Sequence, residues 1–212
     1  MGYQVILDLV GSAIAGGLLV LSLLNFSAQN GETKRAFRDE IGAQSNLLSV
    51  VEVLEEDFWQ MGYCKIKNAM AAPIVISAGA DYIAFKTDIP DGAGGEGDGT
   101  PDIITYQLGG FVTSTPNPND RMLLRKVNSG PFVSSSMGVT NFDLQYLKYN
   151  GDTLARPVDA SQLREITAIQ VTIKVENAYP YISTSGRDSL VVVDANWKQL
   201  RFEIRNFGKG AI

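Results

Sequence analysis

The first stretch of the chain is almost entirely apolar. From Val5 to Phe26 the sequence reads VILDLVGSAIAGGLLVLSLLNF, and its only ionisable side chain is that of Asp8. At about 1.5 Å per residue, these roughly 22 residues would form a helix roughly 33 Å long, enough to cross a bilayer core. A secretory signal peptide is the rival interpretation, but its apolar region is normally about 7–15 residues with a basic flank before it. We therefore predict a membrane-spanning helix over residues 5–26.

A second helical pattern follows the polar passage SAQNGETKR. It predicts an amphipathic helix over residues 37–62, with an apolar stripe that needs a partner surface. Gly62 is a candidate C-cap. Acidic residues near this end oppose the helix dipole, so they are either solvated or engaged elsewhere. The stripe comprises Phe37, Ile41, Leu47, Leu48, Val51, Leu54, Phe58 and Met61, and the opposite face carries Arg38, Glu52, Glu55 and Glu56.

Beyond Gly62 the period of the pattern changes to two, which is typical of strands with one buried face. Turn-forming residues separate the alternating runs, for example at Pro116–Asp120, Ser129–Pro131, Asn150–Asp152 and Ser183–Gly186. The predicted strands are Tyr82–Phe85, Ile103–Leu108, Met122–Val127, Phe142–Tyr149, Ile169–Val175 and Leu200–Ile204.

These patterns predict an α+β fold in which a long N-terminal helix packs on an antiparallel sheet. The helix would occupy residues 1–62, with residues 5–26 in the membrane or a filament core and residues 37–62 against the sheet. Residues 63–212 would form a β-rich globular head. We expect the stripe to face that sheet, because the sheet is the apolar surface that the chain provides.

Composition removes several classes of function. The net charge of −5 gives no domain-wide positive field that would collect phosphates, so specific nucleic-acid readout is not expected. The chain has no histidine, which excludes a Ser-His-Asp triad and the commonest metal ligand. Its single cysteine, Cys64, permits neither an intrachain disulfide nor a cysteine-cluster zinc site. We therefore expect no enzymatic activity.

Asp8 is the most informative residue of the apolar segment. A carboxylate within hydrocarbon costs at least about 2.5 kcal/mol, so it is normally kept for a partner. The alternative is that Asp8 lies close enough to the N-terminus to reach the headgroups. Orientation is poorly marked: Lys34, Arg35 and Arg38 follow the span and by charge alone favour a cytoplasmic C-terminal side.

One loop has the composition of a calcium site. It is rich in glycine and lies between two predicted strands, and hard oxygen ligands on such a loop suit Ca²⁺. The spacing does not match an EF-hand, and a solvated acidic hairpin loop is the alternative. The candidate ligands are Asp88, Asp91, Glu96, Asp98 and Asp102.

The order of these features resembles the type IV pilins and type II secretion pseudopilins. An apolar and then amphipathic helix leads into an antiparallel sheet. The helix end Asp57–Cys64 is similar to the segment before the first strand in those proteins. Phe142–Tyr146, Ile166–Val175 and Leu200–Asn206 are similar to strands in the heads of larger minor pilins and of the J-type pseudopilin.

The resemblance implies roles at the N-terminus. In this family a glycine precedes the leader cleavage site, and a glutamate follows as the fifth mature residue. Gly2 would be that glycine, Tyr3 the first mature residue, and Asp8, as the sixth, the counterpart of the glutamate. These three are the candidate assembly residues.

The resemblance further implies a filament subunit that leaves the inner membrane and packs through its apolar helix with copies of itself or with other pilin-like subunits. The head would then be periplasmic or extracellular. Two alternatives are open from the residues themselves. One is a single-pass anchored binding protein, and the other is a subunit of another membrane complex.

Overall fold

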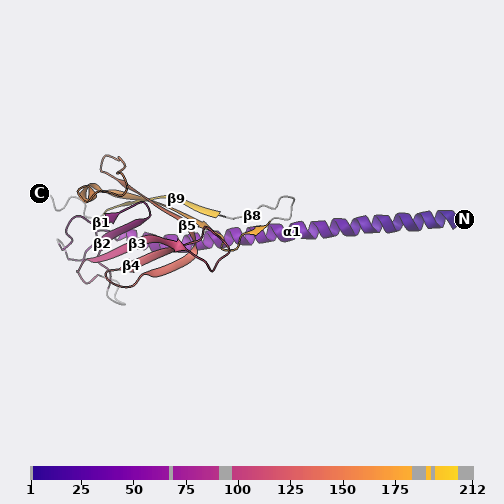
Figure 1. Cartoon of the computed structure of the whole chain (residues 1–212), viewed down its shortest axis with the longest axis horizontal. Coiled ribbons are helices and arrows are strands. Elements are labelled where there is room, and N and C mark those ends of the chain that lie inside the picture. Colours follow the sequence, from indigo (N-terminus) through magenta and orange to yellow (C-terminus); the bar gives the residue numbers. More distant parts are fainter. Residues whose placement is uncertain (1, 67–68, 91–96, 183–189, 192–193, 205–212) are drawn as a thin grey trace.

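The computed structural model describes residues 2–66, 69–90, 97–182, 190–191 and 194–204. A single helix, α1 (Gly2–Trp59), extends without interruption from the N-terminus into a β-rich head (Figure 1). The head packs only against the C-terminal part of α1, and the N-terminal part projects far beyond it. The predicted α+β architecture, a long helix packed on an antiparallel sheet, is confirmed.

The main sheet of the head is antiparallel and seven-stranded, in the order β1-β2-β3-β4-β5-β6-β9. Strands adjacent in the sequence are neighbours from β1 to β6, so these strands form a meander, and β9 then pairs with β6. The strands are β1 (Val75–Ala78), β2 (Tyr82–Thr87), β3 (Asp102–Phe111), β4 (Arg121–Val127), β5 (Val133–Leu147), β6 (Ala168–Glu176) and β9 (Asp194–Glu203). A short pair, β7 (Tyr181–Ile182) with β8 (Leu190–Val191), and a 3-10 turn, η1 (Leu163–Glu165), complete the described elements.

All six predicted strands lie within or largely overlap observed ones, because each has the alternating pattern that one buried sheet face produces. In β6, for example, Val171, Ile173 and Val175 are buried between half-buried Thr172 and Lys174. The strand segments that the prediction missed are β1, β7, β8 and the first halves of β5 and β9. The run of β1 is short, and the first half of β5, VSSSMG, is mostly exposed and carries little apolar signal. The predicted turn at Ser183–Gly186 lies outside the described residues.

The C-terminal part of α1 forms one side of the head's core. Its buried residues recur at helical spacing and face the sheet: Ala43, Leu47, Val50, Val51, Leu54 and Phe58. The predicted stripe was partly wrong, since Phe37, Ile41 and Leu48 are 63%, 50% and 67% exposed. At about 100° per residue these three share a different face of the helix, turned away from the sheet. The core face instead includes Ala43 and Val50, which the prediction omitted.

Phe58 is the centre of the contact between helix and sheet. Its ring lies 5.2 Å from that of Phe85, 5.0 Å from that of Phe202 and 5.8 Å from that of Tyr106, measured between centroids. All four side chains are almost completely buried. Because these rings come from α1, β2, β3 and β9, they fix the helix to strands far apart in the sequence.

The helix ends close to the predicted cap. Gly62 has a φ of +75°, the left-handed conformation that glycine adopts at little cost. Its N–H donates to the carbonyl of Lys86 at 2.9 Å, so the turn after α1 is tied directly to β2.

Candidate assembly surface

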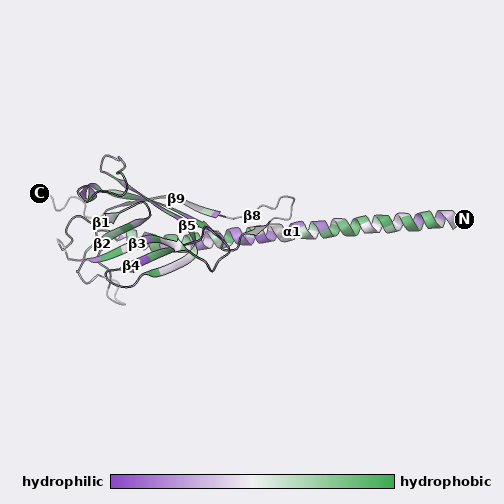
Figure 2. Cartoon of the chain, viewed as in Figure 1, coloured by the Kyte–Doolittle hydropathy of each residue, from purple (hydrophilic) through white to green (hydrophobic). Residues whose placement is uncertain are grey.

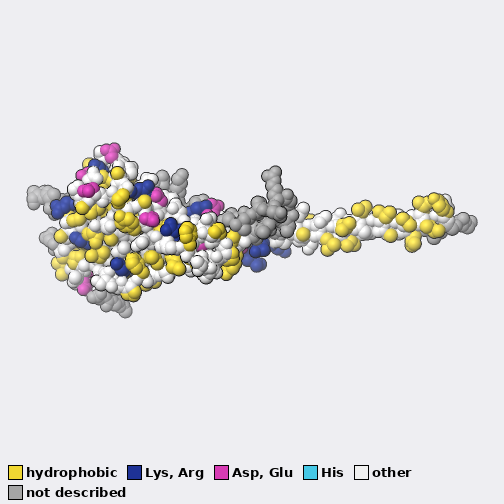
Figure 3. All heavy atoms as spheres, in the orientation of Figure 1, with side chains coloured by type: hydrophobic (Ala, Val, Ile, Leu, Met, Phe, Trp, Pro, Cys, Tyr) yellow, Lys and Arg dark blue, Asp and Glu magenta, His cyan; other side chains and the backbone are white. Residues whose placement is uncertain are grey.

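The N-terminal part of α1 is a free-standing apolar helix. Every residue whose exposure is described from Tyr3 to Arg35 is exposed. Hydrophobic side chains dominate this part of the helix (Figure 2), and they lie along both edges of the face that Figure 3 shows. It is long and apolar enough to cross a membrane, and none of its most apolar stretch is buried within the chain. A surface of this kind requires a bilayer or other protein to cover it.

The three candidate assembly residues lie at the tip of this helix. Gly2 is its first residue, Tyr3 is 78% exposed, and Asp8 is exposed one and a half turns further on. Among the described residues, the side chain of Asp8 forms no hydrogen bond or ion pair. Their roles in assembly stay predictions.

The small residues of the span leave the helix surface open. A Cβ atom built on Gly11, Gly16 or Gly17 would meet no heavy atom within 4 Å. Each glycine therefore offers a place where another helix backbone can approach closely. The helix continues unbroken through all three, although each costs about 1 kcal/mol of helix propensity.

A buried polar cluster, not predicted from the sequence, joins the end of α1 to the sheet. Asp57 accepts hydrogen bonds from Arg125 Nε at 2.6 Å and Nη2 at 2.9 Å, and also from the Tyr106 hydroxyl. Burial, then the adjacent carboxylate, raises the pKa of Tyr106 far above its usual range. The same carboxylate raises the pKa of Arg125, so its guanidinium stays charged. Pairing between residues 68 positions apart has no local sequence signal.

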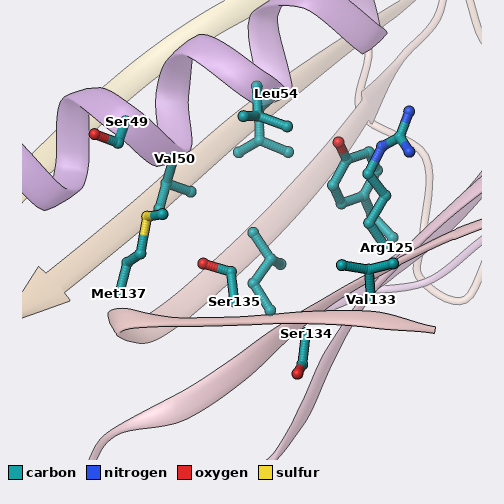
Figure 4. Close-up of a pocket in the computed structure, with 11 residues that line it drawn as sticks. Ser49, Val50, Leu54, Arg125, Val133, Ser134, Ser135 and Met137 are labelled. Carbon is teal, nitrogen blue, oxygen red and sulfur yellow. The ribbon is translucent and has the colours of Figure 1, made fainter.

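A groove beside this cluster separates α1 from β4 and β5 (Figure 4). Ser135 projects toward the helix and Ser134 from the opposite face of the strand, and the Ser135 hydroxyl has no partner among the described residues. The volume is about 210 Å³, below the roughly 300–1,000 Å³ typical of small-molecule sites. The lining is mainly apolar and includes Val50, Val53 and Leu54 of α1, Leu123 of β4, and Val133 and Met137 of β5.

The acidic loop uses its described carboxylates to satisfy the chain's own donors. Asp88, 1% exposed, accepts from the N–H groups of Lys65 at 2.9 Å and Gly99 at 3.0 Å. Asp102 accepts from Ile89 N at 3.0 Å and from Asn128 Nδ2 at 2.6 Å.

Asp98 accepts from Thr100 N at 2.6 Å, and Asp91 and Glu96 lie outside the described residues. Within the described ranges no group of three potential ligands converges. The calcium site stays a prediction. Calorimetric titration with Ca²⁺ tests this prediction. A heat of binding that is lost in Asp98→Asn would support a calcium site. No heat at millimolar Ca²⁺ would show that the acidic loop does not bind the ion.

A second buried carboxylate was also missed. Glu176, at the end of β6, is 4% exposed and accepts from Lys174 Nζ at 2.8 Å and from the side-chain amides of Asn117 at 3.1 Å and Asn119 at 3.2 Å. Burial alone would raise the pKa of Glu176, but these hydrogen bonds outweigh it and leave the pKa below its usual value. The cluster fastens the β3–β4 loop, which the sequence showed only as a turn.

Comparison with known proteins finds similarity in structure but not in sequence. No family model matches the sequence, and no curated protein matches it significantly. Among solved structures, a type IV-like pilin from Thermus thermophilus aligns over 78% of this chain and 97% of its own, with 9% sequence identity and a TM-score of 0.48. The function of this chain therefore has to be inferred from its own residues.

Proposed function

We propose that the chain is a structural subunit of a type IV pilus-like or pseudopilus-like extracellular filament, assembled through its apolar N-terminal helix. The observation that carries the proposal is the free-standing half of α1. Its apolar side chains have no partner within the described chain, yet the helix is rigidly continuous with a well-packed head. Such a helix can be covered by a bilayer first and by neighbouring subunits afterwards.

The second half of the helix favours a filament over a simple membrane anchor. Phe37 and Ile41 lie well beyond the residues 5–26 that a bilayer would cover. Their side chains are 63% and 50% exposed. A single-pass anchor needs no apolar residues on the helix outside the bilayer. A filament core does, because helices from several copies pack there along their length.

The head supports a structural role rather than a catalytic one. Among its buried carboxylates, Asp57, Asp88 and Glu176 each hold a strand or loop in place through hydrogen bonds to the chain itself. A fourth, Asp120, accepts a hydrogen bond from the Thr115 hydroxyl. The groove beside α1 is apolar and small. We infer that the head faces the periplasm or the exterior, and that its partners are copies of this chain or similar subunits.

Fractionation of cells tests the proposal. An antibody against the head should detect the chain both in membranes and in pelletable fibres sheared from the surface. A single-pass binding protein, the principal alternative, would remain in the membrane fraction under all shear conditions. A soluble-only distribution would contradict both.

A further inference from the structure

Two oppositely charged bands lie on the same exposed face of α1. The basic band, Lys34 and Arg38, is on the free-standing helix just before the head, where a cluster of dark blue side chains is visible (Figure 3). The acidic band, Glu52 and Glu56, is on the part of α1 that passes along the head. All four side chains are exposed, and none forms an ion pair with another described residue.

Within one helix each band is arranged unfavourably. Lys34 and Arg38 are four residues apart, as are Glu52 and Glu56, so like charges lie side by side on the helix surface. Glu56 also lies in the last turn of α1, where the helix dipole disfavours negative charge. The chain therefore gains nothing internally from either band.

The spacing of the bands matches the helical repeat. Lys34 and Glu52, and likewise Arg38 and Glu56, are separated by 18 residues, which is five turns of about 3.6 residues or about 27 Å. Both bands consequently point in the same direction, roughly opposite the buried face of Leu47 and Leu54. The head leaves this direction open.

We propose that parallel copies of the chain pack with an axial offset of about 27 Å, so that Lys34 and Arg38 of one copy pair with Glu52 and Glu56 of the next. This rests on the proposed function and specifies its partner surface: a second copy of the same helix. No other parallel offset along α1 places both basic residues opposite acidic ones. Charge complementarity of this kind fixes register more than it adds affinity.

The same offset also aligns apolar residues. It places Phe37 and Ile41 of one copy level with Leu19 and Leu23 of the other, and all four side chains are at least half exposed. The exposed apolar face beside the charged bands is thereby covered, which charge pairing alone would not achieve. A single register thus accounts for both the ionic bands and the apolar residues outside the membrane span.

Disulfide cross-linking between two positions tests the register. In a Cys64→Ser background the chain has no other cysteine, so Arg38→Cys with Glu56→Cys places one thiol in each band. These positions are about 27 Å apart within one rigid helix, whereas a disulfide needs Cα atoms within about 7 Å, so only different copies can be joined. Mild oxidation of sheared fibres should give a ladder of covalent multimers.

Matched variants make the result specific. Arg38→Cys with Ser49→Cys, also an exposed position on this side of the helix but only 11 residues away, should give no ladder, and neither should either single variant. Fibres that form without the 38–56 ladder would overturn the offset while leaving the proposed function intact. A cross-linked species that stops at the dimer would also overturn it, because antiparallel helices form closed pairs. Absence of fibres altogether would refute both proposals.

Charge reversal provides a second measurement. Lys34→Glu with Arg38→Glu should strongly reduce the fibre fraction, and adding Glu52→Lys with Glu56→Lys should restore it. All four positions are exposed, so the melting temperature of the head should not change. Removing positive charge after the span does not oppose export of the head. If the fourfold variant assembles no better than the twofold one, the bands do not meet.

Discussion

Replacing Phe58 with alanine should uncouple the long helix from the head. The ring is completely buried among Phe85, Tyr106 and Phe202, with centroids 5.0–5.8 Å away. Phenylalanine-to-alanine changes at such sites cost about 3–5 kcal/mol, against a typical total stability of about 5–15 kcal/mol. The substitution therefore removes a large share of the head's stability and the aromatic contacts of Phe58 with three strands, and it leaves only the contact of Trp59 with Phe202 between helix and sheet rings.

Urea unfolding of the detergent-solubilised full chain, followed by near-ultraviolet circular dichroism, measures the effect. With a slope of about 2 kcal/mol per molar urea, the midpoint should fall by about 1.5–2.5 M. Leu48→Ala is the matched control: Leu48 lies on the same helix but is 67% exposed, so its replacement should change stability by less than about 0.5 kcal/mol. Equal midpoint shifts for the two variants would refute the assignment of the buried helix face.

Three further outcomes follow from individual side chains. Asp8→Ala should keep or improve membrane insertion, because it removes a charge from the span, but it should lower the amount of the chain in sheared fibres. If the amount in fibres is unchanged, Asp8 lies at the level of the headgroups and has no partner in the filament. Burial raises the pKa of both Tyr106 and Tyr146 above the unfolded value of about 10. Stability is therefore complete below about pH 10 and declines above it, and Tyr106→Phe with Tyr146→Phe should flatten that decline in melting curves. Burial raises the pKa of Glu176, but hydrogen bonds including that from Lys174 outweigh burial, so the pKa is lowered on balance. The stabilisation by Glu176 is therefore present above about pH 4.3 and is lost as the pH falls through the pKa of the folded state. Glu176→Gln should reduce this loss of stability in acid, measured by melting curves at different pH.

The sequence predicted those elements whose signal is periodic. The apolar segment 5–26, the change of period after Gly62 and the alternating strands all reflect burial on one face, which a single sequence records directly. The prediction assigned three residues to the wrong face of the helix, namely Phe37, Ile41 and Leu48. A spacing of three and four residues defines an apolar stripe, but it does not say which of two apolar faces contacts the sheet. That depends on the side from which the sheet packs against α1, which only the three-dimensional structure shows.

The polar clusters could not be predicted for a different reason. Asp57 meets Arg125, and Glu176 meets Asn117, only because the meander brings strands distant in sequence to the same helix end or loop. The carboxylates of the acidic loop were recognised by composition, but whether they face an ion or the chain's own N–H groups depends on backbone geometry. Asp88 shows the latter, with three hydrogen bonds from Lys65 and Gly99 to its two oxygens.

Electron cryomicroscopy of sheared surface fibres, with peptide mapping of the same material, would show whether the chain is a filament subunit. We expect fibres that contain this chain, with helices from residue 3 to about 42 packed together at the centre and the β-rich heads on the outside. Fibres that lack the chain, or the chain present only as single copies with residues 5–26 in lipid, would contradict this expectation.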